Sequence, residues 1–134
     1  MNVTARTVER DLGSITAVVV SMTIALIACA GLAFDGGRLL GARLDAADHA
    51  ENAARAGAQH VTAIREGRWR LDGPAARDAA LGYLSSAGVS GDVAVVGDEV
   101  TVTVTVHRRM ALLGVVGVGD RTVSATRTAR PVDR

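Results

Sequence analysis

GSITAVVVSMTIALIACAGLAF, residues 13–34, contains no charged side chain, although Arg10 and Asp11 precede it and Asp35 and Arg38 follow it. A helix rises about 1.5 Å per residue, so a run of this length crosses a hydrocarbon layer of about 30 Å. Its Ser and Thr hydroxyls can return hydrogen bonds to the helix backbone and do not exclude lipid. The stretch therefore predicts one transmembrane helix over residues 13–34, preceded by a polar leader over residues 1–12.

The alternative to a membrane span is the buried central helix of a soluble domain. The chain has 134 residues, and its aromatic residues are Phe34, Trp69 and Tyr83. A chain this short, with so few large side chains, can hardly surround a helix that is apolar on every side. The membrane span is therefore the favoured interpretation.

Two processing events would change the fate of this helix. Residues 28–30, Ala-Cys-Ala, have the small-x-small pattern of a signal-peptide cleavage site, and Leu26-Ile27-Ala28-Cys29 resembles a lipobox with Cys29 as the lipidated residue. The apolar run continues past either cut to Phe34, and it exceeds the apolar core of about 7–15 residues found in signal peptides. A retained anchor is favoured, and a lipid-anchored envelope binding domain is the alternative.

The charge balance argues against a nucleic-acid partner. The chain carries 15 basic and 14 acidic residues, for a formal net charge of +1. A large basic field, which is typical of nucleic-acid binding, is missing from this composition. Because Cys29 is the single cysteine, an internal disulfide is excluded.

The residues after the span predict an amphipathic helix from Asp35 to about Glu66. This region is rich in Ala and free of Pro, and its apolar residues recur at helical steps. Gly36 and Gly37 separate it from the span and suggest either a bend at the membrane surface or the close approach of another helix. The predicted helix-packing stripe is Leu40, Leu44, Ala47, Ala54, Ala58 and Val61.

The remaining sequence predicts a short second helix and a small sheet. Asp72-Gly73-Pro74 is a helix start that follows a loop over residues 67–73, and the helix ends at Gly88. Strands are predicted over residues 92–96, 100–107 and 120–129, with an apolar connector over residues 108–118. The predicted fold is α+β, with a long N-terminal helix, a short helix and a three-stranded antiparallel sheet, and residues 35–134 form the domain outside the membrane.

The sequence offers no constellation of catalytic, cofactor-binding or metal-binding residues. His49, His60 and His107 lie far apart and lack the H-E-x-x-H spacing of a zinc helix. The glycines in residues 114–119 do not open a helix after a first strand, as a dinucleotide loop requires. We therefore expect a non-enzymatic protein with neither a cofactor nor a small-molecule substrate.

The chain resembles the TadE/TadG-like Flp pilus assembly proteins, especially small actinobacterial members. The resemblance rests on the leader ending near Gly13, the span, the Asp35-Gly36-Gly37-Arg38 junction, the segment A-A-R-A-G-A at residues 53–58, L-L-G-V-V-G at residues 112–117 and T-V-S-A-T at residues 122–126. It implies a pilin-like fold and a minor-pilin-like or pseudopilin-like component of a type IVb (tight adherence) pilus or a type II-like secretion assembly.

The same resemblance bears on processing, orientation and partners. Pseudopilins of this type carry a Glu five residues after the cleavage Gly, whereas the fifth residue after Gly13 is Val18, so peptidase processing at Gly13 stays open. Two Arg lie close to either end of the span, so charge does not decide the orientation. The resemblance implies a cell-membrane protein with a cytoplasmic N-terminus and an extracytoplasmic domain. Its partners would be membrane lipid and copies or other pilus or secretion components, bound through the N-terminal helix.

Overall fold

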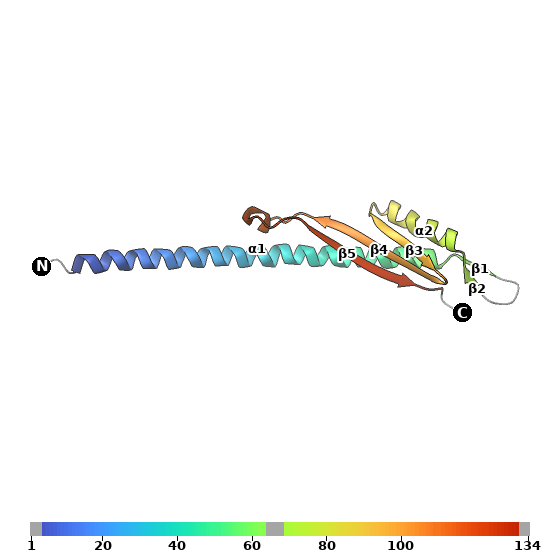
Figure 1. Ribbon diagram of the computed structural model, residues 1–134, viewed down its shortest axis with the longest axis horizontal. Coiled ribbons are helices and arrows are strands. Elements are labelled where there is room, and N and C mark those ends of the chain that lie inside the picture. The colour runs from blue at the N-terminus through green and yellow to red at the C-terminus, as the bar shows by residue number, and fades with distance from the viewer. Residues whose placement is uncertain (1–3, 64–68, 132–134) are drawn as a thin grey trace. The chain divides into compact units, whose positions relative to one another are not determined.

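The computed structural model describes residues 4–63 and 69–131 (Figure 1). Along the chain the elements are α1 (Thr4–Ala58), β1 (Val61–Ala63), β2 (Trp69–Leu71), α2 (Gly73–Ser86), β3 (Gly91–Val96), β4 (Glu99–Arg108), the 3₁₀ helix η1 (Leu113–Val116) and β5 (Arg121–Ala129). They divide into two compact units: Met1–Gly37 with Met110–Gly119, and Arg38–Arg109 with Asp120–Arg134. The predicted α+β class, with a long first helix and a three-stranded antiparallel sheet, is confirmed.

Helix α1 contains the apolar run and also residues 4–12 of the predicted leader. The prediction that helix continues to about Glu66 was wrong, because α1 ends at Ala58. After this point the chain tightens, with His60 N–H donating to the Gly57 carbonyl (3.1 Å), and Val61–Ala63 then pairs with β2. The β-branched Val61 and Thr62 favour this extended pairing over another helical turn.

The two-stranded sheet of β1 and β2 was not predicted. It is antiparallel, with Thr62 opposite Arg70, and β2 occupies part of the predicted loop over residues 67–73. Three residues per strand carry too short an alternation to be recognised from sequence. Helix α2 begins at Gly73, within the predicted helix start, and Asp72 is its N-cap. The Asp72 Oδ1 accepts a hydrogen bond from Ala75 N–H (3.2 Å), and Pro74 lies in the first turn.

The larger sheet has the strand order β3-β4-β5, and both pairings are antiparallel. The Gly97-Asp98 turn joins β3 to β4, and Gly97 has a φ of 59°, which explains glycine at this position. The strict Val/Thr alternation of β4 places Val100, Val102 and Val104 on a fully buried face. The three strands are thus specified by a local pattern of period two.

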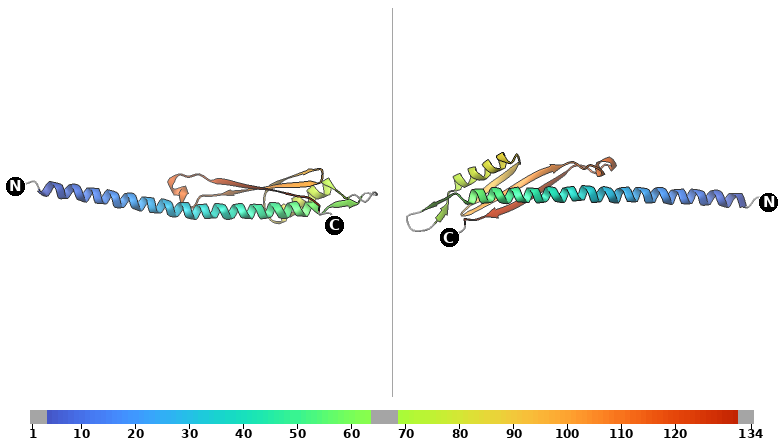
Figure 2. Two further views of the ribbon diagram at one scale, coloured as in Figure 1. Left: turned by 90° about the horizontal axis from the view of Figure 1, so that it is seen from below. Right: turned by 180° about the vertical axis from the view of Figure 1, so that it is seen from behind.

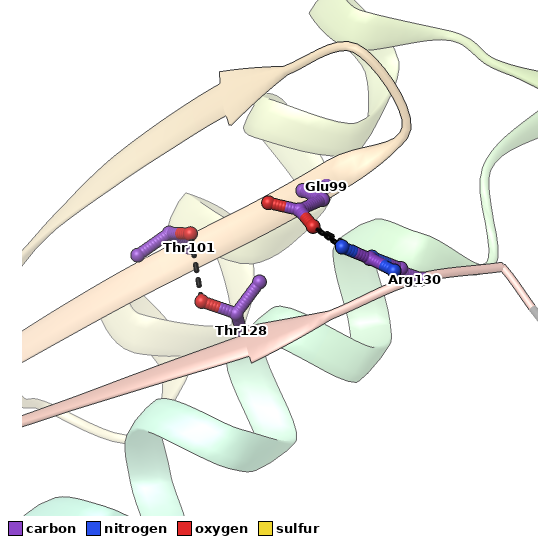
Figure 3. Close-up of polar contacts among 4 residues, drawn as sticks. All are labelled: Glu99, Thr101, Thr128 and Arg130. Atoms are coloured by element: carbon purple, nitrogen blue, oxygen red, sulfur yellow. Dashed lines mark hydrogen bonds and ion pairs between the residues drawn. The ribbon is translucent and has the colours of Figure 1, made fainter.

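The opposite face of the sheet carries hydroxyl pairs between β4 and β5. Thr101 and Thr128 lie with their hydroxyl oxygens 2.9 Å apart, and Thr103 and Thr126 repeat the contact at 2.8 Å. Figure 3 shows the first of these pairs beside the ion pair that Arg130 makes with Glu99. This exposed, polar face needs no covering layer.

The core of the larger unit lies between the valine face of the sheet and two helices. Ala46 to Ala58 of α1 and Ala76, Ala80 and Leu84 of α2 pack against Val93, Val100, Val102 and Val104. Figures 1 and 2 show α2 running beside β3, and the Arg77 guanidinium donates to the Val93 carbonyl oxygen (2.8 Å). Because most helical contributions to this core are alanines, the helices approach the sheet closely.

Candidate functional site at the end of the apolar helix

The apolar half of α1, residues 14–34, exposes almost all of its large side chains. Its large apolar residues, whose exposed fractions run from 51 to 66%, are Ile15, Val18, Val19, Val20, Met22, Ile24, Leu26, Ile27, Leu32 and Phe34. By length and composition this helix is able to cross a membrane. A continuous apolar surface of this extent is stable only against lipid or an apolar partner.

Asp35, the first charged residue after this run, is almost completely buried, with 2% of its surface exposed. Its carboxylate accepts three successive backbone N–H bonds within the same compact unit. Ala111 N–H donates to Oδ1 (3.0 Å), and Leu112 and Leu113 N–H donate to Oδ2 (3.0 and 2.8 Å). A buried carboxylate is costly unless it is hydrogen-bonded, and bonds to a charged acceptor are stronger than neutral ones. Asp35 therefore fastens the segment that joins β4 to β5 onto α1.

Gly31, one helical turn before Asp35, is the second contact point of this segment. It is buried, and a Cβ added to it would lie 3.4 Å from Leu113 Cδ2 and 3.5 Å from Leu112 Cβ. A Cβ at these distances would make ordinary van der Waals contact, so only a side chain larger than that of alanine would push the leucines away from α1. The connecting segment (Met110–Gly119) thus lies against the helical turn from Gly31 to Asp35, by apolar contact at one end and hydrogen bonds at the other.

Of the predicted junction residues, the structure buries only Asp35 among the side chains it describes there. Gly36, Gly37 and Arg38 are exposed and helical, and α1 continues through the glycine pair without a break. A Cβ at either glycine would meet no atom within 4 Å. A neighbour that leaves too little room for a Cβ occurs at Gly57 instead.

The residues of the predicted helix-packing stripe differ in burial. Ala47, Ala54 and Ala58 are buried, whereas Leu40 and Leu44 are 61% and 58% exposed and Val61 lies beyond the helix in β1. The buried face consists of small residues at steps of four, four, three and four, namely Ala42, Ala46, Ala50, Ala53 and Gly57.

The physical reason for this difference is the short distance between α1 and its neighbours. A Cβ on Gly57 would lie 2.7 Å from the Ala76 carbonyl oxygen and 3.0 Å from Val100 Cγ1. Leucine does not fit on a face packed this closely, so Leu40 and Leu44 occupy another side of the helix. The sequence signal for this face is the recurrence of Ala and Gly at steps of three and four. A search for large apolar residues at the same steps does not find it.

The two predicted processing positions lie within regular helix. Gly13 and Cys29 both belong to α1, and the Cys29 thiol is exposed. Cleavage at either position would divide a helix that runs without interruption through both. Processing at Gly13 and lipid attachment at Cys29 stay predictions.

Two ion pairs lie outside this site, near the C-terminal end of α1 and along β4. A shallow groove of about 830 Å³ runs along the end of α1 and β5, and its lining includes Glu51, Arg55 and Arg130. Arg55 pairs with Glu51, and Arg130 pairs with Glu99. In the part of the chain that the structure describes, no group of three or more His, Cys, Asp or Glu residues is placed to hold a metal ion. The arrangement as a whole supplies apolar and small-residue surfaces, which is the chemistry of association.

Comparison with known protein families agrees with the sequence resemblance. Residues 13–60 match the family described as "Putative Flp pilus-assembly TadE/G-like". The match covers the apolar half of α1, Asp35 and the buried small-residue face, and it leaves out β3, β4 and β5. No curated protein and no solved structure matches the chain. The matched family is one of assembly components and not a known enzyme class.

Proposed function

We propose that this chain, which carries a TadE/G-like region over residues 13–60, is a membrane-anchored, non-enzymatic component of Flp pilus assembly. The observation that carries the proposal is the exposed apolar surface of α1 over residues 14–34, within that same region. Such a surface requires lipid or an apolar partner, and pilus assembly supplies both. The finer form of the proposal is a minor-pilin-like or pseudopilin-like subunit of a tight adherence pilus or a type II-like secretion assembly.

The proposed topology places residues 1–12 in the cytoplasm, residues 13–34 in the bilayer and residues 35–134 outside. Burial of Asp35 beside its N–H donors supports a boundary at the end of the apolar run, since a carboxylate is excluded from hydrocarbon. Leu40 and Leu44, which are exposed on α1 beyond this boundary, offer an apolar surface to another pilus subunit or a second copy.

A cell that assembles Flp pili provides the test of this function. Loss of the chain should reduce piliation, the full chain should restore it, and crosslinking should recover other pilus components with it. The restored chain should remain in the membrane pellet after carbonate washing. Normal piliation without the chain, together with a chain that washes off, would contradict the proposal.

The lipid-anchored alternative is favoured only by the Leu26-Ile27-Ala28-Cys29 pattern. Replacement of Cys29 with Ser separates the two anchors. We expect the Cys29→Ser chain to keep its size and its membrane location, because the helix itself is the anchor. Loss of a lipid label and a change in processed mass would instead support lipidation, and mass spectrometry of the native N-terminus would read the result directly.

A further inference from the structure

The connecting segment (Met110–Gly119) is an apolar link between two polar strand ends. It contains Met110, Leu112 and Leu113, and the Leu112 side chain is 48% exposed although it also contacts α1 at Gly31. A connection of this kind between two strands is normally polar, because connections lie in water. The composition of this segment therefore needs an apolar environment that the described contacts supply only in part.

The depth of Gly31 identifies that environment. Residues 14–34 span about 31 Å of helix at about 1.5 Å per residue, which matches a hydrocarbon core of about 30 Å. Gly31 precedes the end of this run by three residues and therefore lies about 4–5 Å inside the boundary. Leu112 and Leu113 contact Gly31, so they reach the edge of the hydrocarbon when the helix spans the bilayer.

Several backbone N–H groups of the segment have hydrogen-bond partners within the protein, as a site with little water requires. Irregular backbone at membrane depth is tolerated only where its polar groups have partners. Asp35 accepts the N–H groups of residues 111–113, and within the segment Gly117 N–H and Val118 N–H donate to the Gly114 and Leu113 carbonyls (3.2 and 3.0 Å). An exposed loop in water would not require this satisfaction, since water itself supplies partners.

The charges that flank the segment in sequence suit phospholipid headgroups. Arg108 and Arg109 precede it and Arg121 follows it, with Asp120 as the one nearby acid. All of these are exposed, and Arg108 lies opposite Arg121 in the β4–β5 pairing. Guanidinium groups that flank an apolar segment in sequence are a pattern that anionic lipid attracts.

We infer that the connecting segment is a second membrane contact, which inserts Leu112 and Leu113 into the outer edge of the bilayer while Asp35 holds it against the transmembrane helix. The inference rests on the membrane anchoring in the proposed function, but not on pilus assembly. It assigns the segment one partner, a phospholipid surface with anionic headgroups. Asp35 acts here as a positioning residue.

The test uses the full chain in vesicles of phosphatidylcholine and phosphatidylglycerol. In a Cys29→Ser background, one environment-sensitive fluorophore is placed by Met22→Cys, Leu112→Cys or Val96→Cys. Met22 reports the middle of the span, and Val96, which is 74% exposed in β3, is the matched apolar control. Ala111→Cys, also at an exposed position, repeats the measurement one residue away in case the first label disturbs the segment.

We expect brominated lipid to quench the probes at positions 22 and 112, and aqueous iodide to quench the probe at position 96 several-fold more than either. Iodide quenching at positions 112 and 111 equal to that at 96, with position 22 still in lipid, would overturn the inference and leave the anchor intact. Protection at 112 without quenching by brominated lipid would indicate a protein contact and would also overturn it. A probe at position 22 that is open to iodide would contradict the anchor itself.

The role of Asp35 has its own readout. In the Asp35→Asn chain an NH₂ group replaces one of the two acceptor oxygens and faces N–H donors. We therefore expect iodide quenching of the probe at position 112 to rise several-fold, while quenching at position 22 is unchanged. Asp45→Asn, at an exposed position of the same helix, is the matched control and should leave both probes unchanged. An unchanged signal at position 112 in the Asp35→Asn chain would show that the leucines hold the segment without the carboxylate.

Discussion

The two halves of α1 share one helical backbone but differ in which side chains they bury. Over residues 14–34 the large side chains are outside, and half or more of each surface is exposed. Over residues 42–58 the buried positions are Ala or Gly, several of them with no exposed surface. Large apolar residues on α1 thus lie on surface that the chain leaves exposed, and small residues lie on surface that the chain covers itself.

Of the changes considered, a charge introduced into the first half of α1 should have the largest effect, because it opposes insertion of that half into lipid. Arg at the centre of a span costs about 2.5–3.5 kcal/mol of insertion free energy. We expect Ile24→Arg to release much of the chain from carbonate-washed membranes, as measured by immunoblotting of pellet and supernatant. Val96→Arg, at an apolar but water-facing position, should leave the retained fraction unchanged.

Removal of the carboxylate at the boundary between the halves should have the next largest effect. Asp35→Ala leaves the N–H groups of residues 111–113 without their acceptor, and we expect a loss of about 2–3 kcal/mol in local opening free energy. Hydrogen exchange of these three amides should accelerate accordingly. Exchange that stays as slow as in the unchanged chain would contradict this account, and Asp45→Ala serves as the reference variant.

Two glycines on the second half should respond to alanine with opposite signs. At Gly57 the new Cβ would meet the Ala76 carbonyl oxygen at 2.7 Å, so Gly57→Ala should destabilise the chain by about 1–3 kcal/mol. At Gly41 a Cβ would meet no atom within 4 Å, and Gly41→Ala should stabilise the helix by up to about 1 kcal/mol. Thermal unfolding in detergent measures both, and shifts of the same sign would refute the close-packing argument.

The smallest expected effect lies on the exposed face of the sheet. Thr103 and Thr126 share a hydrogen bond across β4 and β5, and cross-strand pairs of this kind contribute about 0.2–1 kcal/mol. A double-mutant cycle with Thr103→Val and Thr126→Val, followed by chemical unfolding, should give a coupling free energy in this range. A coupling near zero would show that the pair adds nothing beyond strand propensity.

The sequence predicted features whose signals are local. Asp72 with Pro74 marks the start of α2 and the Val/Thr alternation marks β4, so both were found where the structure has them. Charge-free length marks a helix that is long and apolar enough to cross a membrane. The predicted stripe combines small residues that the chain itself buries with Leu40 and Leu44, which it leaves exposed, because its periodicity was not weighted for side-chain size.

The contact between Asp35 and the connecting segment carries no local signal. Its donors are backbone N–H groups, which every non-proline residue has, and they lie 76 to 78 residues away in the chain. The end of α1 at Ala58 was missed because the helical pattern continues past it in sequence. In the structure, Val61–Ala63 instead pairs with β2, which lies later in the chain. Sequence periodicity does not report partners of this kind.

Asp35 precedes Ala111 by 76 positions, and this separation also sets an order of events during synthesis. At about 5–20 residues per second, Asp35 is added to the chain about 4–15 s before Ala111, its first N–H partner. During this interval the carboxylate lacks these three donors, and in the proposed topology its charge opposes deeper entry of the helix into the bilayer. When β4 has formed and residues 111–113 arrive, their N–H groups bind the carboxylate. In that topology one side chain first limits insertion of the helix and later receives the connection between β4 and β5.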